Sequence, residues 1–276
     1  MHAPGVTGLQ APAGASTLIG VDPDLSAIIA ANSAGWDRIA SMRSGLPIER
    51  FRTGGICLAP FEVELAGDVT GKNVLQLACS YGDEVLSWAN LGAVVTGVDI
   101  SEVAVEAARE RATQAGINAD FRRADMLDLP ADLADLDLIY LSWGALCWVP
   151  DLAVLAGTVA GRLRPGGTVL LCEHHPVWEV LAVRGDDRLA VAGDYFGRER
   201  PNADQDDAKR PKGARGEVDA PSFLPFVWPV SDVVTALLDV GLRLEKFFEA
   251  PEPGLYPGLG ASARRLPAYY VIKATK

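Results

Sequence analysis

The sequence predicts an α/β fold in which helices cover both faces of a mostly parallel sheet. From about residue 74 to residue 176, short apolar runs alternate with helical patterns. The runs are almost continuously apolar, as in Val74–Cys79, whereas a strand with one face in water alternates apolar and polar residues. This combination is typical of successive strand–helix units in a parallel sheet.

Five strands and three helices make up the predicted core. Glycines end two of the helices, at Gly92 and Gly116, and the turn Arg164-Pro-Gly-Gly167 precedes the last of the five strands. The strands are expected at 74–79, 94–98, around Phe121, at 136–141 and at 168–172, and the helices at 84–91, 102–115 and 152–163.

The flanking segments are expected to complete a single domain over residues 25–276. Residues 1–24 are rich in Ala, Gly, Pro and Thr and predict a flexible tail, and a helical spacing follows it. Ser231 is a good N-cap for a helix near the end, whereas the polar stretch 184–222 is too long for an ordinary connection. The expected parts are a helical cover (25–70), a cofactor-binding core (71–176), a lid or insertion (177–230) and a closing helix with two strands (231–276).

Composition limits the partners of the chain. Its 276 residues are 49% hydrophobic and carry a formal net charge of −11, which excludes a wholly disordered chain. No charge-free apolar run approaches the roughly 18 residues of a membrane span. The short cationic stretch 209–212 follows three aspartates, so nucleic acid is a poor substrate. We expect a small-molecule partner and, because the first residues lack a secretory pattern, a cytoplasmic location.

Cysteine and histidine spacing does not indicate a metal site. The four cysteines form no C-x-x-C pair, and no histidine lies at metal-ligand spacing from them. We therefore expect reduced thiols and no bound metal.

The strongest local signal is a strand–turn–helix followed by a strand that ends in an acid. Gly82 lies in the turn, and Asp99 ends the next strand 17 residues later. In doubly wound folds a ligand binds beyond the carboxyl ends of the strands, where glycine admits close backbone approach and a carboxylate accepts ribose hydroxyls. A hinge glycine or a helix-capping aspartate explains either residue alone, but the pair at this spacing favours a nucleoside site.

The same turn argues against a dinucleotide. The dinucleotide motif G-x-G-x-x-G needs three glycines, and the stretch 78–82 has one. Asp83 and Glu84 place negative charge at the start of the following helix, where a pyrophosphate would lie. This charge suits a cation-bearing ligand such as a sulfonium amino acid.

Residues 74–176 resemble class I S-adenosylmethionine-dependent methyltransferases. Five segments are similar to the motifs of that family in order: 74–83, 98–101, 124–126, 138–144 and 163–168. Flanking segments resemble a bacterial small-molecule subgroup and extend the likeness to about residues 30–275: 32–36, 148–151, 173–176, 193–196 and 236–243. The resemblance implies a Rossmann-like, doubly wound sheet of seven strands with the seventh antiparallel, and S-adenosyl-L-methionine as cofactor.

The resemblance also implies roles for matching residues. Asp99 would hold the ribose hydroxyls, Asp125 the adenine amino group, and Met126 would pack on the adenine ring, although Met126 is equally suited to the core. Ala78 and Ser80 depart from the three glycines that most of the family has, which puts the backbone path around the methionine moiety in question. The full set of implied cofactor-binding residues is Ala78, Ser80, Gly82, Asp99, Ile100, Asp125, Met126, Ser142 and Trp143.

Aromatic residues and two histidines outside these motifs predict the acceptor pocket. Its predicted aromatic walls suit a planar acceptor or the sulfonium, and burial beneath an added helix or lid is the alternative. His174 and His175 follow the fifth strand, where neighbouring side chains point to opposite faces. We predict His175 as the catalytic base because it matches a His-Pro of the subgroup, with a structural hydrogen bond as the alternative. The predicted pocket residues are Trp36, His174, Tyr195, Phe196 and Trp228.

The predicted function is methyl transfer from S-adenosylmethionine to a nitrogen, oxygen or carbon atom of a small, aromatic or specialised metabolite. A hydroxyl acceptor needs a base, whereas placement alone suffices for an amine or an electron-rich ring carbon. A non-catalytic S-adenosylmethionine-binding regulator is the main alternative, and a nucleotide-dependent oxidoreductase is a weaker one. The sequence is compatible with either a homodimer or a monomer.

Overall fold

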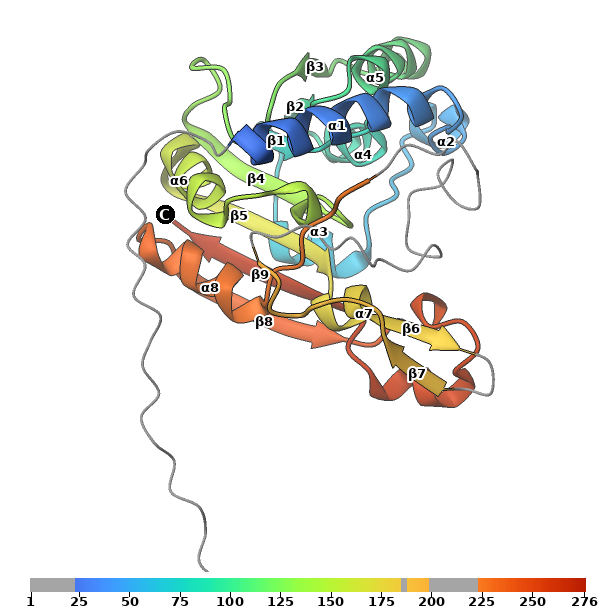
Figure 1. The fold of residues 1–276 in the computed structure, drawn as a ribbon. Helices are drawn as coiled ribbons and strands as arrows, with labels where there is room; N and C mark the ends of the chain where they lie inside the picture. Colours follow the sequence, from blue (N-terminus) through green and yellow to red (C-terminus); the bar gives the residue numbers. More distant parts are fainter. Residues whose placement is uncertain (1–22, 185–187, 199–222) are drawn as a thin grey trace, which may run out of the picture.

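A computed structural model of the chain describes residues 23–184, 188–198 and 223–276. Its main sheet has seven strands in the order β3-β2-β1-β4-β5-β9-β8 (Figure 1). Strands β1 to β5 pair in parallel, whereas β9 is antiparallel to both β5 and β8, so the predicted Rossmann-like fold is confirmed. The strands are β1 (Asn73–Leu77), β2 (Val94–Asp99), β3 (Asp120–Arg123), β4 (Leu136–Ser142), β5 (Leu163–His174), β8 (Arg243–Ala250) and β9 (Tyr269–Thr275).

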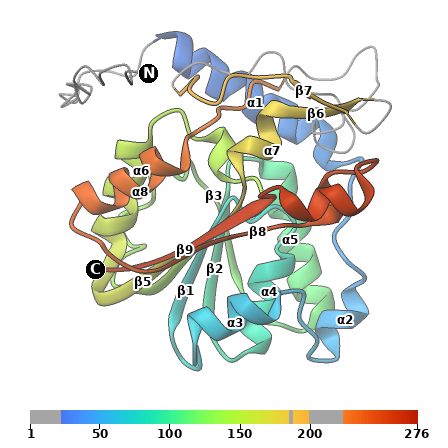
Figure 2. The same cartoon turned by 90° about the horizontal axis from the view of Figure 1, so that it is seen from below.

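Helices cover both faces of this sheet (Figure 2). One face carries α2 (Ile48–Arg52), α3 (Pro60–Ala66), α4 (Asp83–Asn90) and α5 (Glu102–Ala115). The other face carries α6 (Leu152–Arg162) and α8 (Val230–Asp239), with the short 3-10 helix η1 (Leu146–Trp148) before α6. The strands are apolar on both faces because neither face meets water.

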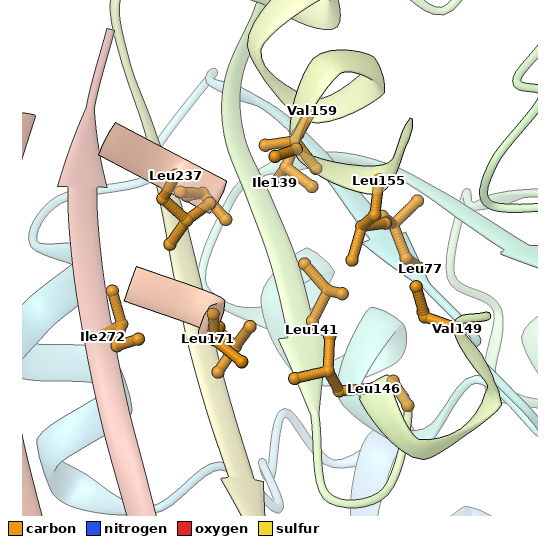
Figure 3. Packing of buried hydrophobic residues seen from close by; sticks show 14 of the residues in the cluster. Leu77, Ile139, Leu141, Leu146, Val149, Leu155, Val159, Leu171, Leu237 and Ile272 are labelled. Atoms are coloured by element: carbon orange, nitrogen blue, oxygen red, sulfur yellow. The ribbon is translucent and has the colours of Figure 1, made fainter. Parts of the chain in front are cut away.

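Side-chain alternation along each strand divides the apolar interior in two. Leu75 and Leu77 of β1 join the cluster beneath α6 and α8, part of which is shown in Figure 3. Val74 lies on the opposite face with Trp88 of α4, whose ring meets that of Tyr140 edge-on at 5.3 Å. Both faces of the sheet are therefore sealed, and the ends of the strands are left for a ligand.

Helix α1 (Pro23–Ala40) lies over the carboxyl ends of the strands (Figures 1 and 2). The Ser101 hydroxyl donates to Asp37 Oδ1 at 2.6 Å, and the Tyr81 hydroxyl donates to the carbonyl of Ala40. Asn32 both accepts from the Leu224 amide at 3.0 Å and donates to its carbonyl at 3.2 Å. These hydrogen bonds hold α1 in place over the carboxyl ends of the strands.

The structure differs from the predicted elements mainly outside the core. Helices α2 and α3 lie in the segment 25–70, where the sequence analysis names no individual helix, although Pro60 at the start of α3 and its capping Glu62 are recognisable helix signals. Helix α8 begins at Val230 after Pro229, so the predicted N-cap at Ser231 is wrong by two positions. Further short helices are α7 (Pro176–Val180), η3 (Pro253–Leu255) and η4 (Gly260–Arg265).

The predicted lid is only partly described. Its first part, expected to be irregular, includes a two-stranded antiparallel pair, β6 (Leu181–Arg184) and β7 (Arg188–Val191). Residues 199–222 of that segment and residues 1–22 of the predicted tail lie outside the described residues. Within the described ranges, no helix has the length and apolar character that crossing a membrane requires.

Candidate functional site

A cavity opens beneath α1 at the carboxyl ends of β1, β2 and β4 and has an empty volume of about 1050 Å³. It lies where the strand order reverses between β1 and β4, which is the usual ligand position in doubly wound sheets. The lining residues that matter below are Trp36, Arg43, Ala78, Ser80, Asp99, Ile100, Asp125, Met126, Ser142, Trp143 and Gly144.

Alternate residues of the turn between β1 and α4 have a left-handed backbone. The φ angles are 52° at Ala78, 49° at Ser80 and 76° at Gly82. An L-residue in this region costs about 1–2 kcal/mol, whereas glycine adopts it freely. The turn thus has at all three positions a conformation that favours glycine, although two of them carry side chains.

Gly82 lies outside the residues that line the cavity. A Cβ at this position would be 2.5 Å from the ring of Phe121, so the glycine is required where β3 packs against the start of α4. The structure therefore gives Gly82 a packing role and a place at the N-cap of α4, instead of the ligand contact expected from the motif.

Asp99 lies at the end of β2 on the cavity wall. Its carboxylate accepts backbone N–H bonds from Ser80 at 2.8 Å and Ser101 at 2.9 Å. Burial raises the pKa of Asp99, and these amide bonds oppose the shift. The two bonds fix the carboxylate between the first two strand ends.

Asp125 and Met126 follow β3 on the same wall. The Asp125 Oδ1 atom accepts the Leu127 amide at 2.9 Å, which orients the carboxylate. Ile100 supplies apolar surface from the neighbouring strand end. An apolar slot beside a fixed carboxylate suits a flat ring that carries an amino donor.

One acidic side chain, Glu84, lies beside Ser142 at the end of β4. The Ser142 hydroxyl donates to Glu84 Oε1 at 3.2 Å, and the Gln76 amide donates to Glu84 Oε2 at 3.2 Å. Burial raises the pKa of Glu84. This carboxyl group provides the cation-favouring environment that the charge at the start of α4 predicts.

Arg43, just after α1, is a site residue that the sequence did not reveal. Its guanidinium lies 5.3 Å from the ring centre of Trp36 and 6.0 Å from that of Tyr81. Among the described lining residues it is the only Lys or Arg. The motif pattern gives no signal for it, because the turn after α1 reaches the cavity only through tertiary packing.

Glu173 holds the wall formed by residues 143–146. Its carboxylate accepts the amides of Gly144 and Ala145 at 2.7 Å and of Leu146 at 2.8 Å. Burial raises the pKa of Glu173 to about 7. The wall includes two further left-handed residues, Trp143 (φ 37°) and Gly144 (φ 97°), so its shape depends on this carboxyl group.

Comparisons with known proteins agree with this geometry. A family model described as a methyltransferase domain matches residues 74–167. An S-adenosylmethionine-dependent methyltransferase structure from Mesorhizobium loti is 26% identical with a TM-score of 0.61, covering 79% of this chain and 96% of that one. The chain belongs to the class I S-adenosylmethionine-dependent methyltransferases.

Curated relatives match about half of the chain. A ubiquinone biosynthesis O-methyltransferase of Bordetella pertussis is 31% identical over 134 residues, which cover 49% of this chain and 53% of that protein. A ribosomal protein L11 methyltransferase of Thiobacillus denitrificans is 31% identical over 156 residues, covering 55% of this chain and 46% of that protein. The chain thus spans about half the length of the curated relatives it matches.

The cavity fits S-adenosylmethionine, the cofactor of this class I family, group by group. Among the lining residues, Asp99 and Asp125 offer carboxylates that could accept hydroxyl and amino groups, Met126 offers apolar surface for a ring, and Arg43 offers a cation for a carboxylate. Among the described residues there is no cluster of three or more His, Cys, Asp or Glu side chains suited to a metal ion.

His175, the predicted base, lies away from the cavity. Its Nδ1 accepts the Val177 amide at 3.1 Å and caps α7, and its Nε2 lies 2.7 Å from Glu249 Oε1. Burial lowers the pKa of His175, and the Glu249 carboxylate opposes the shift. Both ring nitrogens are occupied, so the structure supports the hydrogen-bonding alternative for this residue.

His174 lies next to the cavity wall. Its ring centre is 5.9 Å from that of Trp143 and 4.6 Å from that of Trp178. It also lines a second, smaller cavity beside Glu173 and Trp228. Burial lowers the pKa of His174 to about 4, so the imidazole is neutral near pH 7.

Of the other predicted pocket residues, one lines the main cavity and three do not. Trp36 lines the main cavity. Trp228 is buried and donates to the Val149 carbonyl at 2.7 Å, and it borders only the smaller cavity. Tyr195 and Phe196 contact each other edge-on and line neither cavity, and Phe196 is 62% exposed. Sequence position alone did not show that Tyr195 and Phe196 lie apart from the main cavity.

Proposed function

We propose that this protein transfers the methyl group of S-adenosylmethionine to an oxygen, nitrogen or carbon atom of a small molecule. The observation that carries the proposal is the set of Asp99, Asp125 and Arg43 around one cavity at the strand-order reversal. The two carboxylates can accept hydrogen bonds from the ribose hydroxyls and the adenine amino group, and the guanidinium complements the charge of the methionine carboxylate.

In this proposal the cofactor-binding residues act through fixed polar atoms. Asp99 accepts the ribose hydroxyls with the lone pairs that its two amide bonds leave available. Asp125 accepts the adenine amino group, with Met126 and Ile100 against the ring. Arg43 binds the methionine carboxylate, and Ala78, Ser80, Ser142 and Trp143 enclose the methionine end.

The bound cofactor supplies an electrophilic methyl group on a sulfonium. The buried Glu84 carboxyl group behind Ser142 favours positive charge at that end of the cavity. In-line displacement mainly requires alignment and exclusion of water, so the chain acts by holding its reactants in place. Helix α1, through Trp36, covers this part of the cavity.

The cavity wall at Trp143 and Gly144 favours an enzyme over a non-catalytic binder. These residues lie beyond those assigned to the nucleoside, and they give the cavity additional wall that a pure cofactor sensor would not need. The ubiquinone biosynthesis relatives are O-methyltransferases, whereas the ribosomal relative has a protein as its named target, so the relatives alone do not select the acceptor.

Calorimetry with S-adenosylhomocysteine and with NAD tests the cofactor assignment. We expect binding of the first and none of the second, because the turn has one glycine of the dinucleotide motif and acidic residues follow it. Incubation with methyl-labelled S-adenosylmethionine and a metabolite library then tests turnover. Tight NAD binding would contradict the proposal, and cofactor binding without label transfer to any acceptor would favour the regulator.

A further inference from the structure

The segment that follows α1 contains one arginine and contacts another, and the surroundings of the two differ. The Arg43 guanidinium borders the main cavity over the rings of Trp36 and Tyr81, and it makes no hydrogen bond or ion pair with the described residues. The guanidinium of Arg111 on α5 pairs with Asp83 and donates to two backbone carbonyls. The first arginine is therefore available to a ligand, whereas the second is fully engaged within the protein.

Leu46 ends this segment, and both of its backbone polar groups are bound. Its amide donates to Asp83 Oδ2 at 2.8 Å, and its carbonyl accepts from Arg111 Nη2 at 2.9 Å. The other oxygen of Asp83, Oδ1, pairs with the same guanidinium nitrogen. The Asp83 and Arg111 side chains are 19% and 14% exposed, so this ion pair is shielded from the screening that weakens surface pairs. The pair thus fixes the backbone of Leu46 against the first turn of α4.

Gly45 allows this close approach. A Cβ on Gly45 would lie 2.5 Å from Arg111 Cζ and 2.7 Å from Asp83 Oδ1, far closer than the roughly 3.5–4 Å of an ordinary contact. The guanidinium is not free to swing away, because it would lose its bonds to Asp83, to Leu46 and to the Tyr81 carbonyl, which accepts from Nε at 3.2 Å. A methyl group at this position would consequently displace the segment itself.

The start of the segment is attached to the same turn. The Tyr81 hydroxyl donates to the carbonyl of Ala40, the last residue of α1. Residues 81–83 therefore hold both Ala40 and Leu46, and Arg43 lies midway between these two points. Because only residues 41–45 separate the two attachments, the place of the Arg43 backbone depends on both of them.

We propose that three residues outside the cavity lining hold Arg43 where it binds the carboxylate of S-adenosylmethionine. These positioning residues are Asp83, Arg111 and Gly45. The inference rests on the proposed function, which assigns the carboxylate to Arg43. The two acids at the start of α4 then have different roles, because Asp83 pairs with Arg111, whereas Glu84 bonds to a residue of the cavity wall.

The test separates binding of the carboxylate from binding of the rest of the cofactor. Calorimetry is carried out with S-adenosylhomocysteine and with its decarboxylated analogue, which keeps the ammonium group and the nucleoside. In wild type, the ratio of the two affinities measures what the carboxylate contributes. We expect Gly45→Ala to lower the affinity for S-adenosylhomocysteine by about three- to tenfold, which does not exceed the loss of one charged hydrogen bond, and to leave the affinity for the analogue nearly unchanged.

Asp83→Asn is a second variant, which changes the charge instead of the packing. Asparagine keeps an acceptor for the Leu46 amide but forms no ion pair with Arg111, so the segment is held less firmly. Removal of a negative charge would by itself favour a bound carboxylate. A decrease in affinity for S-adenosylhomocysteine, expected to be about two- to fivefold, therefore identifies lost positioning.

Gly157→Ala in α6 is the matched control. A Cβ there meets open space, and Gly157 lies outside the cavity lining, so both affinities should stay unchanged. A double variant then shows whether the effect of Gly45→Ala passes through the guanidinium of Arg43. In the Arg43→Met background, Gly45→Ala should cause no further loss of affinity for S-adenosylhomocysteine.

The possible failures of this test are distinguishable. With circular dichroism showing folded variants, unchanged affinity in both Gly45→Ala and Asp83→Asn, equal losses for the two ligands, or additive losses in the double variant would overturn the positioning role. Equal affinities of wild type for the two ligands would contradict the assignment of the carboxylate to Arg43 and this inference with it. Absence of S-adenosylhomocysteine binding would contradict the proposed function itself.

Discussion

The proposed cofactor end of the cavity and its proposed acceptor end, the wall at Trp143 and Gly144, are held in place by different kinds of contact. At the cofactor end, Asp99 is held by amides of Ser80 and Ser101, which lie within about one strand–turn–helix unit of it. At the proposed acceptor end, Trp143 lines the cavity, and its ring contacts His174 at the end of β5 and Tyr269 at the start of β9. One end is backbone shaped by a local motif, and the other is a set of side chains assembled by the whole fold.

The difference shows where variation is tolerated. The turn at the proposed cofactor end is shaped by backbone, which all residues share, so Ala78 and Ser80 keep the left-handed conformation that glycine favours. The wall at Trp143 and Gly144 depends instead on particular side chains, such as the Glu173 carboxylate that accepts the Gly144 amide. We therefore expect substitutions at the cofactor end to change affinity and those at the acceptor end to change turnover.

The largest effect should come from Asp99→Ala. Loss of two charged hydrogen bonds to ribose costs on the order of 2–4 kcal/mol, so affinity for S-adenosylhomocysteine should fall tens- to hundreds-fold in calorimetry. Asp120→Ala is the control, because Asp120 starts β3 and pairs with Arg122 outside the cavity. Unchanged affinity in Asp99→Ala, with circular dichroism showing a folded protein, would contradict the ribose assignment.

Glu173→Gln should have the next largest effect and act at the acceptor end. The amide NH₂ cannot accept the N–H bonds of Gly144, Ala145 and Leu146 that the carboxylate accepts, so we expect a loss of about 1–3 kcal/mol in the free energy of unfolding. Urea denaturation measures it. Glu245→Gln on β8, which removes surface ion pairs with Arg243 and Lys273, should cost less than about 1 kcal/mol.

Glu173 and its neighbour His174 should make the free energy of unfolding depend on pH in opposite directions. The pKa of Glu173 is raised from 4.5 to about 7, so its contribution to stability is present below pH 4.5 and is lost as pH rises to about 7. The pKa of His174 is lowered from 6.5 to about 4, so its contribution is lost as pH falls from 6.5 to about 4. The other titratable residues that line the smaller cavity with both are Cys147, Glu179 and Tyr270.

Single variants should separate these two dependences. In H174Q, where Glu173 remains, the free energy of unfolding should fall as pH rises from 4.5 to 7. In E173Q, where His174 remains, it should fall as pH decreases from 6.5 to 4. Urea midpoints measured across this range provide the comparison. The same slope in both variants would show that neither residue governs the pH dependence.

Arg43→Met tests the cation at the cofactor end. Loss of a charged hydrogen bond of about 1.5 kcal/mol should weaken S-adenosylhomocysteine binding roughly tenfold. Methylthioadenosine lacks the carboxylate, so its affinity should be nearly the same for wild type and variant. A parallel loss for both ligands would instead assign Arg43 to packing against Trp36 and Tyr81.

The smallest effect is expected from Ala78→Gly and Ser80→Gly. Each substitution removes the conformational strain of a left-handed L-residue, which costs about 1–2 kcal/mol. This gain is partly offset because glycine has more conformational freedom in the unfolded chain, which lowers stability by about 0.4–1 kcal/mol. Each variant should therefore be stabilised by up to about 1 kcal/mol in urea denaturation. Ala107→Gly within α5 is the control and should lose about 1 kcal/mol. Destabilisation of all three variants would show that the turn is not strained.

The sequence by itself determined the sheet and the cofactor end. Continuous apolar runs predicted β1, β2, β4 and β5, and the positions of Asp99 and Asp125 after strands placed both carboxylates on one sheet edge. This succeeded because strand, turn and ligand contact occur within a few residues of each other. The number of residues between a strand and an acid is then enough to predict where the acid lies relative to the sheet.

Only the tertiary structure decided the acceptor end and the choice between the histidines. Alternation along β5 predicted that His174 and His175 point to opposite faces, but it did not show that Glu249 and Val177 occupy the ring of His175. Arg43 likewise reaches its place through helix packing. Contacts between residues so far apart in the chain depend on how every intervening element packs, and no local pattern of residue types records that arrangement.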